Sequence, residues 1–460
     1  HTYGAWVTDS EPTETETGAK HRGCTVCTYT QRVSIPQLPH THKYETAWSC
    51  DDTYHWHASA CGHTDVISAK GEHDYREGFC TVCGAKEPLP EERLQYILSD
   101  EKNSYLVAGV GSFTGEEVSI PSVYKGLPVA GIGRRAFLNC ANLERITIPA
   151  SVTAIGEEAF KDCLNLQSVI FSEKSVCSRI SAGVFSGCAN LSDIVLPSGV
   201  KIIGGYAFHD CTSLGSITIP EKVTYIEWRA FSGCEALRTV TFAGESACSV
   251  IDEFAFDGCV NLSGIALPSG VTKIKESTFR NCHALTEITI PEGVTSIRSS
   301  AFYGCAALRY NEYGNACYIG NSENPYVALI KSKTADISDC RMHENTKIIA
   351  DSAFCGCASY VPESLKNVTI TAGTAIGAFA FRGCSNLEKV TIPNSVGEIL
   401  NSAFIHCSKL RTVLFGEESE CTTIGSSAFE GCTELREITF PAGIVTIGSL
   451  AFGDCTGLTA

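Results

Sequence analysis

The chain has 460 residues, of which 44% are hydrophobic, so it is long enough to bury a large core. Its formal net charge of −16 argues against nucleic acid or an anionic membrane as the main partner. The 25 cysteines would suggest disulfide bridges in an exported protein, but most of them recur at one position of a repeat. Composition therefore says little about the redox compartment.

Residues 1–87 differ from the rest of the chain and are predicted to form one or more small Cys/His-rich modules. The stretch 1–90 contains eight of the twelve His and three of the four Trp. It also contains every cysteine that lies outside the repeats. The strongest set of candidate metal ligands in this region comprises His57, Cys61, Cys80 and Cys83.

This set fits a structural Zn²⁺ site. The CTVCG turn presents two thiolates, and an HxxxC pair supplies the other half of a tetrahedron. His55 or His73 could take the place of His57. A metal would hold together a segment too small for a core of its own. Disulfides, or neither metal nor disulfides, remain alternatives. Cys24 and Cys27, with His21, His40 or His42 nearby, form a weaker version of the same pattern.

Residues 88–104 are predicted to link this region to a second domain, which spans residues 105–460. The segment from Tyr105 is predicted to be an atypical first coil that caps the open end of the core. Beyond residue 130, an apolar residue, a Phe, two variable positions and a Cys recur. Most steps between the phenylalanines are 23 or 25 residues. The repeated phenylalanines are Phe137, Phe160, Phe185, Phe208, Phe231, Phe256, Phe279, Phe302, Phe354, Phe381, Phe404, Phe429 and Phe452.

A period of this length predicts a solenoid rich in parallel β-sheet, with about fourteen coils joined by short 3-10 or helical turns. In the unit Leu143–Cys163, Ile146 and Ile148 alternate as in a strand with one buried face, and Pro149 ends that strand. Phe160 is expected to fill the core from a turn. Each repeated cysteine is expected to be a buried free thiol that donates to a loop carbonyl. Side chains that point the same way on adjacent coils oppose the disulfide torsion.

One step between phenylalanines is 52 residues long. It is predicted to contain a degenerate coil at residues 337–342 and, near residues 314–333, an inserted β-hairpin. A hairpin that projects from a regular solenoid is a frequent place for function. The alternative is an insertion that merely packs against one flank.

The repeating unit LxxIxIPxxVxxIGxxAFxxC resembles the BspA-like leucine-rich repeats of surface and secreted proteins from gut and oral bacteria. The resemblance covers about residues 105–460. It implies a leucine-rich-repeat solenoid that binds host proteins or neighbouring cells and has no catalytic site. The N-terminal segments are similar to small Cys/His modules that accompany such repeats. Those modules often read HWHxCxxCG, whereas this chain has HWHASACG, with Ser59 near the position of the first Cys.

Strand positions between the inward residues are predicted to face the concave surface. Many of them are threonine, namely Thr147, Thr218, Thr241, Thr289, Thr369, Thr391 and Thr439. This row is either good strand chemistry or a flat polar face for a protein or glycan. In the second case Glu287, Tyr310, Lys389 and Glu437 would add specificity. Trp228 is predicted to be exposed and is a candidate anchor for a partner.

These features predict a non-enzymatic protein, secreted or on the cell surface, that recognises macromolecules of a host or neighbouring cell. His209, His283 and His406 lie on different coils without a repeating acidic partner, which argues against catalysis. No apolar run approaches the ~18–20 residues that span a membrane. We expect a signal peptide and an anchor outside this chain. The alternative is a structural spacer in a cell-envelope protein, with binding by the N-terminal module or by missing segments.

Overall fold

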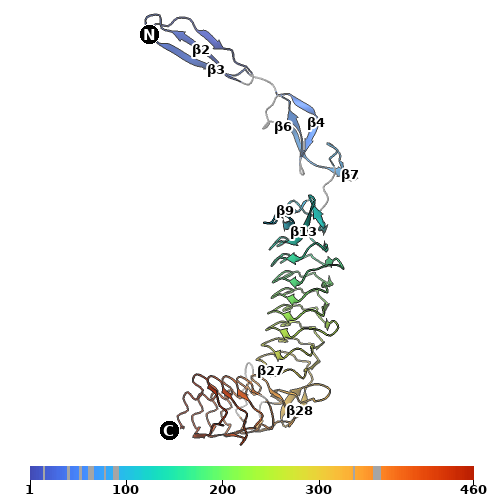
Figure 1. The fold of residues 1–460 in the computed structure, drawn as a ribbon, viewed down its shortest axis with the longest axis vertical. Helices are drawn as coiled ribbons and strands as arrows, with labels where there is room; N and C mark the ends of the chain where they lie inside the picture. The colour runs from blue at the N-terminus through green and yellow to red at the C-terminus, as the bar shows by residue number, and fades with distance from the viewer. Residues whose placement is uncertain are drawn as a thin grey trace. The chain divides into compact units, whose positions relative to one another are not determined.

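The computed structural model describes residues 1–13, 16–38, 42–50, 54–60, 67–76, 79–85, 93–334, 337–355, 364–373 and 375–459 (Figure 1). The chain divides into two compact units, residues 1–89 and residues 90–460.

The first unit is built from short antiparallel strands. One three-stranded sheet contains β1 (Val7–Ser10), β2 (Gly18–Gly23) and β3 (Thr30–Ile35). A second contains β4 (Tyr44–Cys50), β5 (Tyr54–Ser59) and β6 (Ile67–Glu72). A hairpin of β7 (Tyr75–Arg76) and β8 (Phe79–Cys80) follows. Among the described side chains of this unit, the buried residues are Gly18, His55 and Cys80, so hydrophobic burial contributes little to its stability.

The second unit is the predicted parallel β-solenoid. Each regular coil has one strand of two to four residues and a second strand of two residues, such as β14 (Arg145–Ile148) and β15 (Ala154–Ile155). Ile146 and Ile148 are buried and Arg145 is exposed, as their alternation predicts. Strands from successive coils pair in parallel and in register, for example Ile146 with Val169.

The first strands of the coils form one side of the solenoid. They are β11 (Glu117–Ser119), β14, β16 (Ser168–Phe171), β18 (Asp193–Ile194), β20 (Ser216–Ile219), β22 (Thr239–Phe242), β24 (Gly264–Ala266), β26 (Glu287–Thr289), β31 (Asp339–Arg341), β33 (Asn367–Thr369), β35 (Lys389–Ile392), β37 (Thr412–Phe415) and β39 (Glu437–Ile438). The second strands form another side. They are β15, β17 (Arg179–Ile180), β19 (Ile202–Ile203), β21 (Tyr225–Ile226), β23 (Val250–Ile251), β25 (Lys273–Ile274), β27 (Ser296–Ile297), β32 (Ile348–Ile349), β34 (Ala375–Ile376), β36 (Glu398–Ile399), β38 (Thr423–Ile424) and β40 (Thr446–Ile447).

The solenoid begins earlier than residue 105. Within the segment predicted as a linker (88–104), β9 (Gln95–Leu98) pairs antiparallel with β10 (Tyr105–Gly109), which in turn pairs with β13 (Leu127–Ile132). β12 (Val123–Tyr124) lies on the other edge of β13. The Tyr96 ring stacks on the Tyr124 ring with centroids 3.9 Å apart. The antiparallel pair and these rings therefore close the end of the core.

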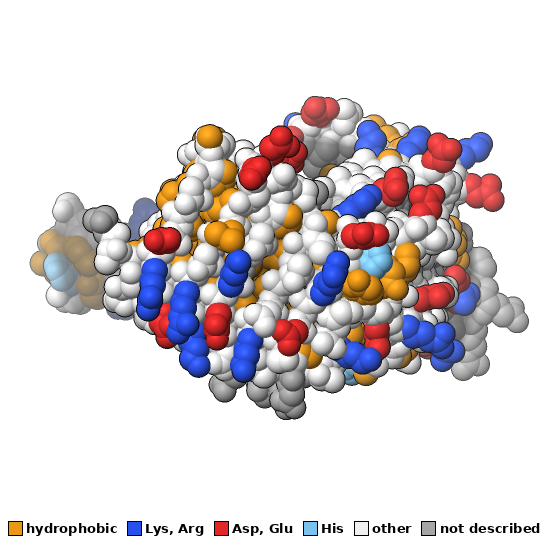
Figure 2. All heavy atoms as spheres, turned by 90° about the horizontal axis from the view of Figure 1, so that it is seen from below, with side chains coloured by type: hydrophobic (Ala, Val, Ile, Leu, Met, Phe, Trp, Pro, Cys, Tyr) orange, Lys and Arg blue, Asp and Glu red, His pale blue; other side chains and the backbone are white. Residues whose placement is uncertain are grey.

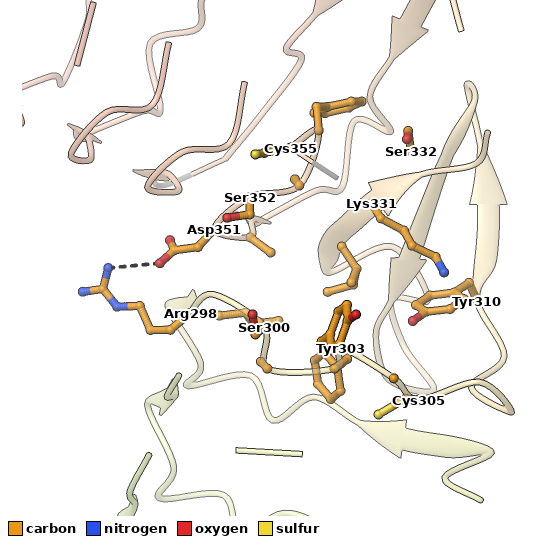
Figure 3. Close-up of a pocket in the computed structure, with 18 of the residues that line it drawn as sticks. Arg298, Ser300, Tyr303, Cys305, Tyr310, Lys331, Ser332, Asp351, Ser352 and Cys355 are labelled. Atoms are coloured by element: carbon orange, nitrogen blue, oxygen red, sulfur yellow. Dashed lines mark ion pairs between the residues drawn. The ribbon is translucent and has the colours of Figure 1, made fainter. Parts of the chain in front are cut away.

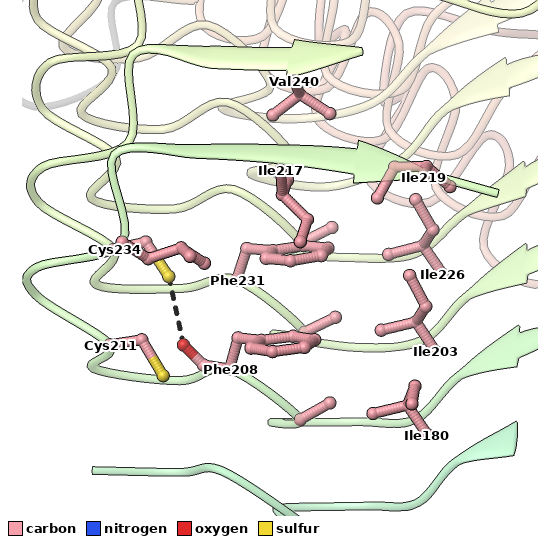
Figure 4. Packing of buried hydrophobic residues seen from close by; sticks show 14 of the residues in the cluster. Ile180, Ile203, Phe208, Cys211, Ile217, Ile219, Ile226, Phe231, Cys234 and Val240 are labelled. Atoms are coloured by element: carbon pink, nitrogen blue, oxygen red, sulfur yellow. Dashed lines mark hydrogen bonds between the residues drawn. The ribbon is translucent and has the colours of Figure 1, made fainter. Parts of the chain in front are cut away.

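The third side of each coil is a turn that carries the repeated Phe and Cys (Figure 4). Rings of successive coils stack with centroids 4.9 to 5.8 Å apart, as Phe208 does on Phe231 at 5.2 Å. The Cys234 thiol donates to the Phe208 carbonyl at 3.0 Å, and the same contact recurs in most coils. All described cysteines are free thiols, and most of those in the solenoid are buried.

The turns are not helical among the described residues. Each is closed by a backbone bond such as Cys163 N–H to Phe160 O at 3.2 Å. The residue two before each described Phe and, in most turns, the residue two after it have a positive φ, as in Glu158 (55°) and Asp162 (58°). The left-handed conformation explains why Asn, Asp, Gly or His precedes most of the repeated cysteines.

The long step between Phe302 and Phe354 contains β28 (Asn311–Tyr313), β29 (Ala316–Ile319) and β30 (Ala328–Ser332). β28 pairs antiparallel with β29, and β29 pairs antiparallel with β30. β30 then pairs in parallel with β32. In Figure 1 the stack of coils changes direction at this insertion. The buried residues accordingly fall into two clusters, which meet here.

Candidate functional site

Two His and two Cys of the first unit converge on one point. His55 comes from β5, Cys80 ends β8, and His73 and Cys83 lie on the adjoining turns. Their candidate ligand atoms all lie within 4.8 Å of one another. His55 Nδ1 is 3.8 Å from Cys80 Sγ, and His73 Nδ1 is 3.4 Å from Cys83 Sγ. Two nitrogens and two sulfurs in a group this compact match the ligand set of a structural zinc site.

Local structure prepares this arrangement. The Cys83 turn is closed by a bond from Gly84 N–H to Cys80 O at 2.9 Å, and Gly84 has a positive φ of 72°. Gly71 pairs with His55 across β5 and β6. A Cβ at Gly71 would lie 3.0 Å from His55 Nε2, so glycine leaves room for the imidazole ring.

The pKa values of the two thiols are shifted in opposite directions. Burial works against ionisation of Cys80. Hydrogen bonds from the Cys83 backbone, from His73 and from the Val82 backbone nevertheless lower the pKa of Cys80 to about 5. Burial raises the pKa of Cys83, and the neighbouring Cys80 sulfur adds to this effect. The pair therefore holds one thiolate readily, and the second proton leaves more easily when a cation is bound.

The observed group overlaps the predicted set of His57, Cys61, Cys80 and Cys83 in its two C-terminal cysteines. The ring of His57 stacks instead on Trp48, with centroids 3.9 Å apart, and its Nδ1 lies 3.2 Å from the Ala47 carbonyl. Cys61 lies outside the described residues. Strand alternation does not separate the two rings, because His55 also meets Trp48, edge to face at 4.9 Å, and the pairing of β5 with β6 shifts register between His55 and His57.

The weaker candidate pair, Cys24 and Cys27, is joined by His1 rather than by His21. Cys27 Sγ lies 3.2 Å from His1 Nδ1, whereas His21 contacts Asp9. Hydrogen bonding, first from the Val26 backbone, lowers the pKa of Cys24. This group offers three ligands and is more exposed than the first.

The predicted threonine row is only partly continuous. Thr218 pairs with Thr241, and Thr369 pairs with Thr391. Ile170, Ala266 and Leu414 occupy the equivalent position in other coils, beside Thr147, Thr289 and Thr391. Thr439 follows β39, and the side chains of Glu287, Lys389 and Glu437 are exposed on their strands. On the face seen in Figure 2, Lys and Arg are interspersed with Asp and Glu.

Trp228 is 41% exposed and belongs to an aromatic cluster on the turn side of the solenoid. Tyr206 meets it edge to face at 4.7 Å, and His209 meets Tyr206 at 5.2 Å. The guanidinium of Arg229 lies over the rings of both Trp228 and Phe254. Because neighbouring rings and a cation hold the indole in place, Trp228 presents a rigid surface to solvent.

A cavity of about 660 Å³ lies between the turns of Phe302 and Phe354 (Figure 3). Tyr310, predicted to face the concave surface, lines this cavity, and burial raises its pKa. Lys331 Nζ lies over the Tyr310 ring at 4.5 Å. Across the cavity, Asp351 pairs with Arg298 at 3.6 Å and accepts a bond from Ala378 N–H at 2.8 Å. Burial raises the pKa of Asp351 despite these contacts. The 52-residue step between Phe302 and Phe354 marked this place in the sequence, but spacing did not predict a cavity there.

The fold defines a parallel β-solenoid whose coils are closed by Phe–Cys turns. Residues 130–247, 249–323 and 331–459 match the BspA type leucine rich repeat region, in six copies. The chain therefore belongs to the BspA type leucine-rich repeat family.

Solved structures with similarity to the chain include a leucine-rich repeat protein from Bacteroides ovatus. It shares 27% sequence identity, covers 79% of this chain and 91% of its own, and gives a TM-score of 0.43. A leucine rich cell surface protein from Faecalibacterium prausnitzii shares 26% identity, covers 79% of this chain and 96% of its own, and gives a TM-score of 0.41. No curated protein matches the chain. Within the described residues, no helix has the length and apolar character to cross a membrane.

Proposed function

We propose that the protein is a non-enzymatic binding protein, secreted or displayed on the cell surface, that recognises macromolecules of a host or neighbouring cell. Membership of the BspA type leucine-rich repeat family supports this class of function. The observation that carries the proposal is the exposed Trp228, held by Tyr206 and Arg229. Anchors of this kind dominate the energetics of protein interfaces.

The partner is a protein or glycan, because the rigid indole offers an apolar face and the guanidinium of the adjacent Arg229 offers hydrogen-bond donors. The residue next to Trp228, Glu227, is paired with Arg179 at 2.7 Å, which favours a specific contact over general electrostatic attraction. No catalytic step is part of this proposal.

The experiment is a binding screen of the full chain on arrays of host matrix proteins and glycans. The Trp228→Ala variant is expected to lose retained partners. Val195→Ala is the matched control, because Val195 is exposed but belongs to no aromatic cluster. Equal binding by the Trp228→Ala variant and the wild-type protein would exclude this surface.

The second candidate is a structural spacer. The interlocked Phe stack and the in-register strands favour it, because both resist bending of the coils. If the solenoid is only a spacer, its surface variants should leave binding on the same arrays unchanged. Any binding by the full chain should then be abolished by variants in residues 1–89.

We also propose that the first unit binds a structural Zn²⁺ through His55, His73, Cys80 and Cys83. The convergence of their ligand atoms and the small buried core of this unit support the proposal. Four protein ligands complete a tetrahedron, so the ion would have a structural role. Elemental analysis of purified protein is expected to give zinc that Cys80→Ser removes.

A further inference from the structure

The turns of successive coils are joined by a regular backbone ladder. In a regular turn, three N–H groups donate to carbonyls of the next turn. The donors are the N–H groups of the residue two before Phe, of Phe itself, and of the residue two after Phe. In the turn of Phe279 these donors are Ser277, Phe279 and Asn281, and the acceptors are Ser299, Ala301 and Tyr303, at 2.7 to 3.0 Å.

The ladder is broken at one step among the described residues. The corresponding donors of the next turn are Ser300, Phe302 and Gly304, and none of them has a hydrogen-bond acceptor in the described part of the chain. On the far side, the Ala353 carbonyl accepts no bond from a described residue, although the equivalent Ala380 carbonyl accepts from Phe354 N–H at 2.7 Å. Ring stacking is broken at the same step, because Phe302 stacks on Phe279 and Phe354 on Phe381 but not on each other.

The insertion explains this break. β30 adds a strand that pairs with β32, although Asp351 N–H still donates to the Ile297 carbonyl of the preceding coil at 2.9 Å. A Phe–Cys turn follows the second strand of each regular coil, but none follows β30 in the described chain after Ser332. The 660 Å³ cavity lies where such a turn would be. One wall of the cavity is therefore the turn of Phe302, whose three N–H groups have no acceptor among the described residues, and the other is the turn of Ala353 and Phe354. The two phenylalanine rings themselves are buried.

We propose that this cavity binds a peptide segment of a partner protein that carries a Phe in a tight turn. The peptide backbone bonds to the Ser300, Phe302 and Gly304 N–H groups, and its aromatic ring lies against Tyr303, which lines the cavity and is 45% exposed. It thereby continues the hydrogen-bond ladder, as an added strand completes an open sheet edge. The volume suits one turn of this size.

The charged side chains around the cavity favour a peptide that has an acidic residue next to its Phe. Lys333 is neutralised by Glu312 at 2.6 Å, and Arg298 is paired with Asp351. Lys331 has no acidic partner among the described residues and lies over the Tyr310 ring at the cavity wall (Figure 3). A carboxylate on the peptide would meet this lysine. This inference does not depend on the proposed recognition by Trp228.

The test uses a fluorescein-labelled synthetic peptide that reproduces one turn of the chain, residues 252–259 with Cys259→Ser. It contains Phe256 and flanking acidic residues. The full chain is expected to bind it saturably in fluorescence anisotropy. A peptide in which Phe256 is also replaced by Ala is expected to bind at least about tenfold more weakly, because it loses the buried ring.

Two protein variants locate the binding. Ser332→Trp fills the cavity and is expected to abolish binding, whereas Ser332→Ala is its matched control. Lys331→Glu is expected to weaken binding several-fold at low salt, and Lys366→Glu, an exposed lysine elsewhere, is expected to have no effect. Thermal unfolding shows whether each variant retains its fold. The proposal is overturned if the wild-type chain does not bind the peptide, if the Ala peptide binds equally well, or if the folded Lys331→Glu and Ser332→Trp variants both bind like the wild type.

Discussion

The cysteines of the two units illustrate how surroundings decide the chemistry of one side chain. In the first unit, backbone N–H groups and His73 lower the pKa of Cys80 to about 5, and Cys27 and Cys50 are exposed. In the solenoid, burial raises the pKa of Cys234, and its thiol donates to the Phe208 carbonyl. The first environment favours a thiolate that binds a cation, and the second favours a neutral packing group.

The largest expected effect is the loss of metal from the first unit. The apparent free energy of binding at structural zinc sites is on the order of 10 kcal/mol, so Cys80→Ser should unfold this unit and leave the solenoid intact. Metal analysis and hydrogen exchange of residues 54–83 measure the outcome. Cys50→Ser is the control, because Cys50 is not in the ligand group. Stoichiometric zinc in the Cys80→Ser variant would contradict the assignment.

The second expected effect is a difference in thiol reactivity. The thiolate is the reactive form, so the buried thiols of Cys211 and Cys259, whose pKa values burial raises well above normal, should resist iodoacetamide at pH 8. Cys27 and Cys50 should be modified in the folded protein. Peptide mapping by mass spectrometry measures both. Labelling of Cys211 and Cys259 as fast as that of Cys50 would show that the core is open to solvent.

A third comparison concerns the ring stack. Phe231→Ala should lower the free energy of unfolding by about 3–5 kcal/mol, because it removes a fully buried ring between two others. Trp228→Ala, three residues away and half-exposed, should lower it by only about 1 kcal/mol, through loss of its contact with Tyr206. Urea unfolding followed by circular dichroism measures the difference. Similar losses for the two variants would contradict the assignment of inner and outer positions.

The smallest expected effect is that of one thiol donor. Cys234→Ala should lower the free energy of unfolding by about 1–2 kcal/mol, since the Phe208 carbonyl loses the thiol donor, keeping only Cys211 N–H, and a buried sulfur is removed from the core. Cys27→Ala, at an exposed position, should have no measurable effect in the same urea titration. If Cys234→Ala is as stable as the wild type, neither the hydrogen bond nor the packing of this thiol contributes measurably to stability.

The sequence was sufficient to predict the solenoid, because a period of 23 or 25 residues leaves little choice of architecture. Ile146, Phe160 and Cys163 are buried as their spacing predicts. The left-handed residues of each turn were missed, although Asp162 and its equivalents carry the signal in their residue types. The choice of His55 over His57 depends on which neighbour each ring reaches across the sheet, and residue spacing does not specify this.

The cavity could not be predicted from the repeat, because it arises from a turn that the insertion omits. Tyr310 fits the strand pattern by position, but it lines the cavity, where Lys331 lies over its ring. An interruption of the period therefore indicates where the regular packing of the coils ends. It does not indicate which backbone N–H groups lack an acceptor there.

The central claim is that one backbone ladder joins the turns and is broken between Phe302 and Phe354. Residue-resolved amide hydrogen exchange of the full chain tests this claim most directly. Ser277, Phe279 and Asn281, which donate to the next turn, should exchange slowly, as should Phe354. Ser300, Phe302 and Gly304 should exchange much faster. Equally slow exchange at these three amides would contradict the account.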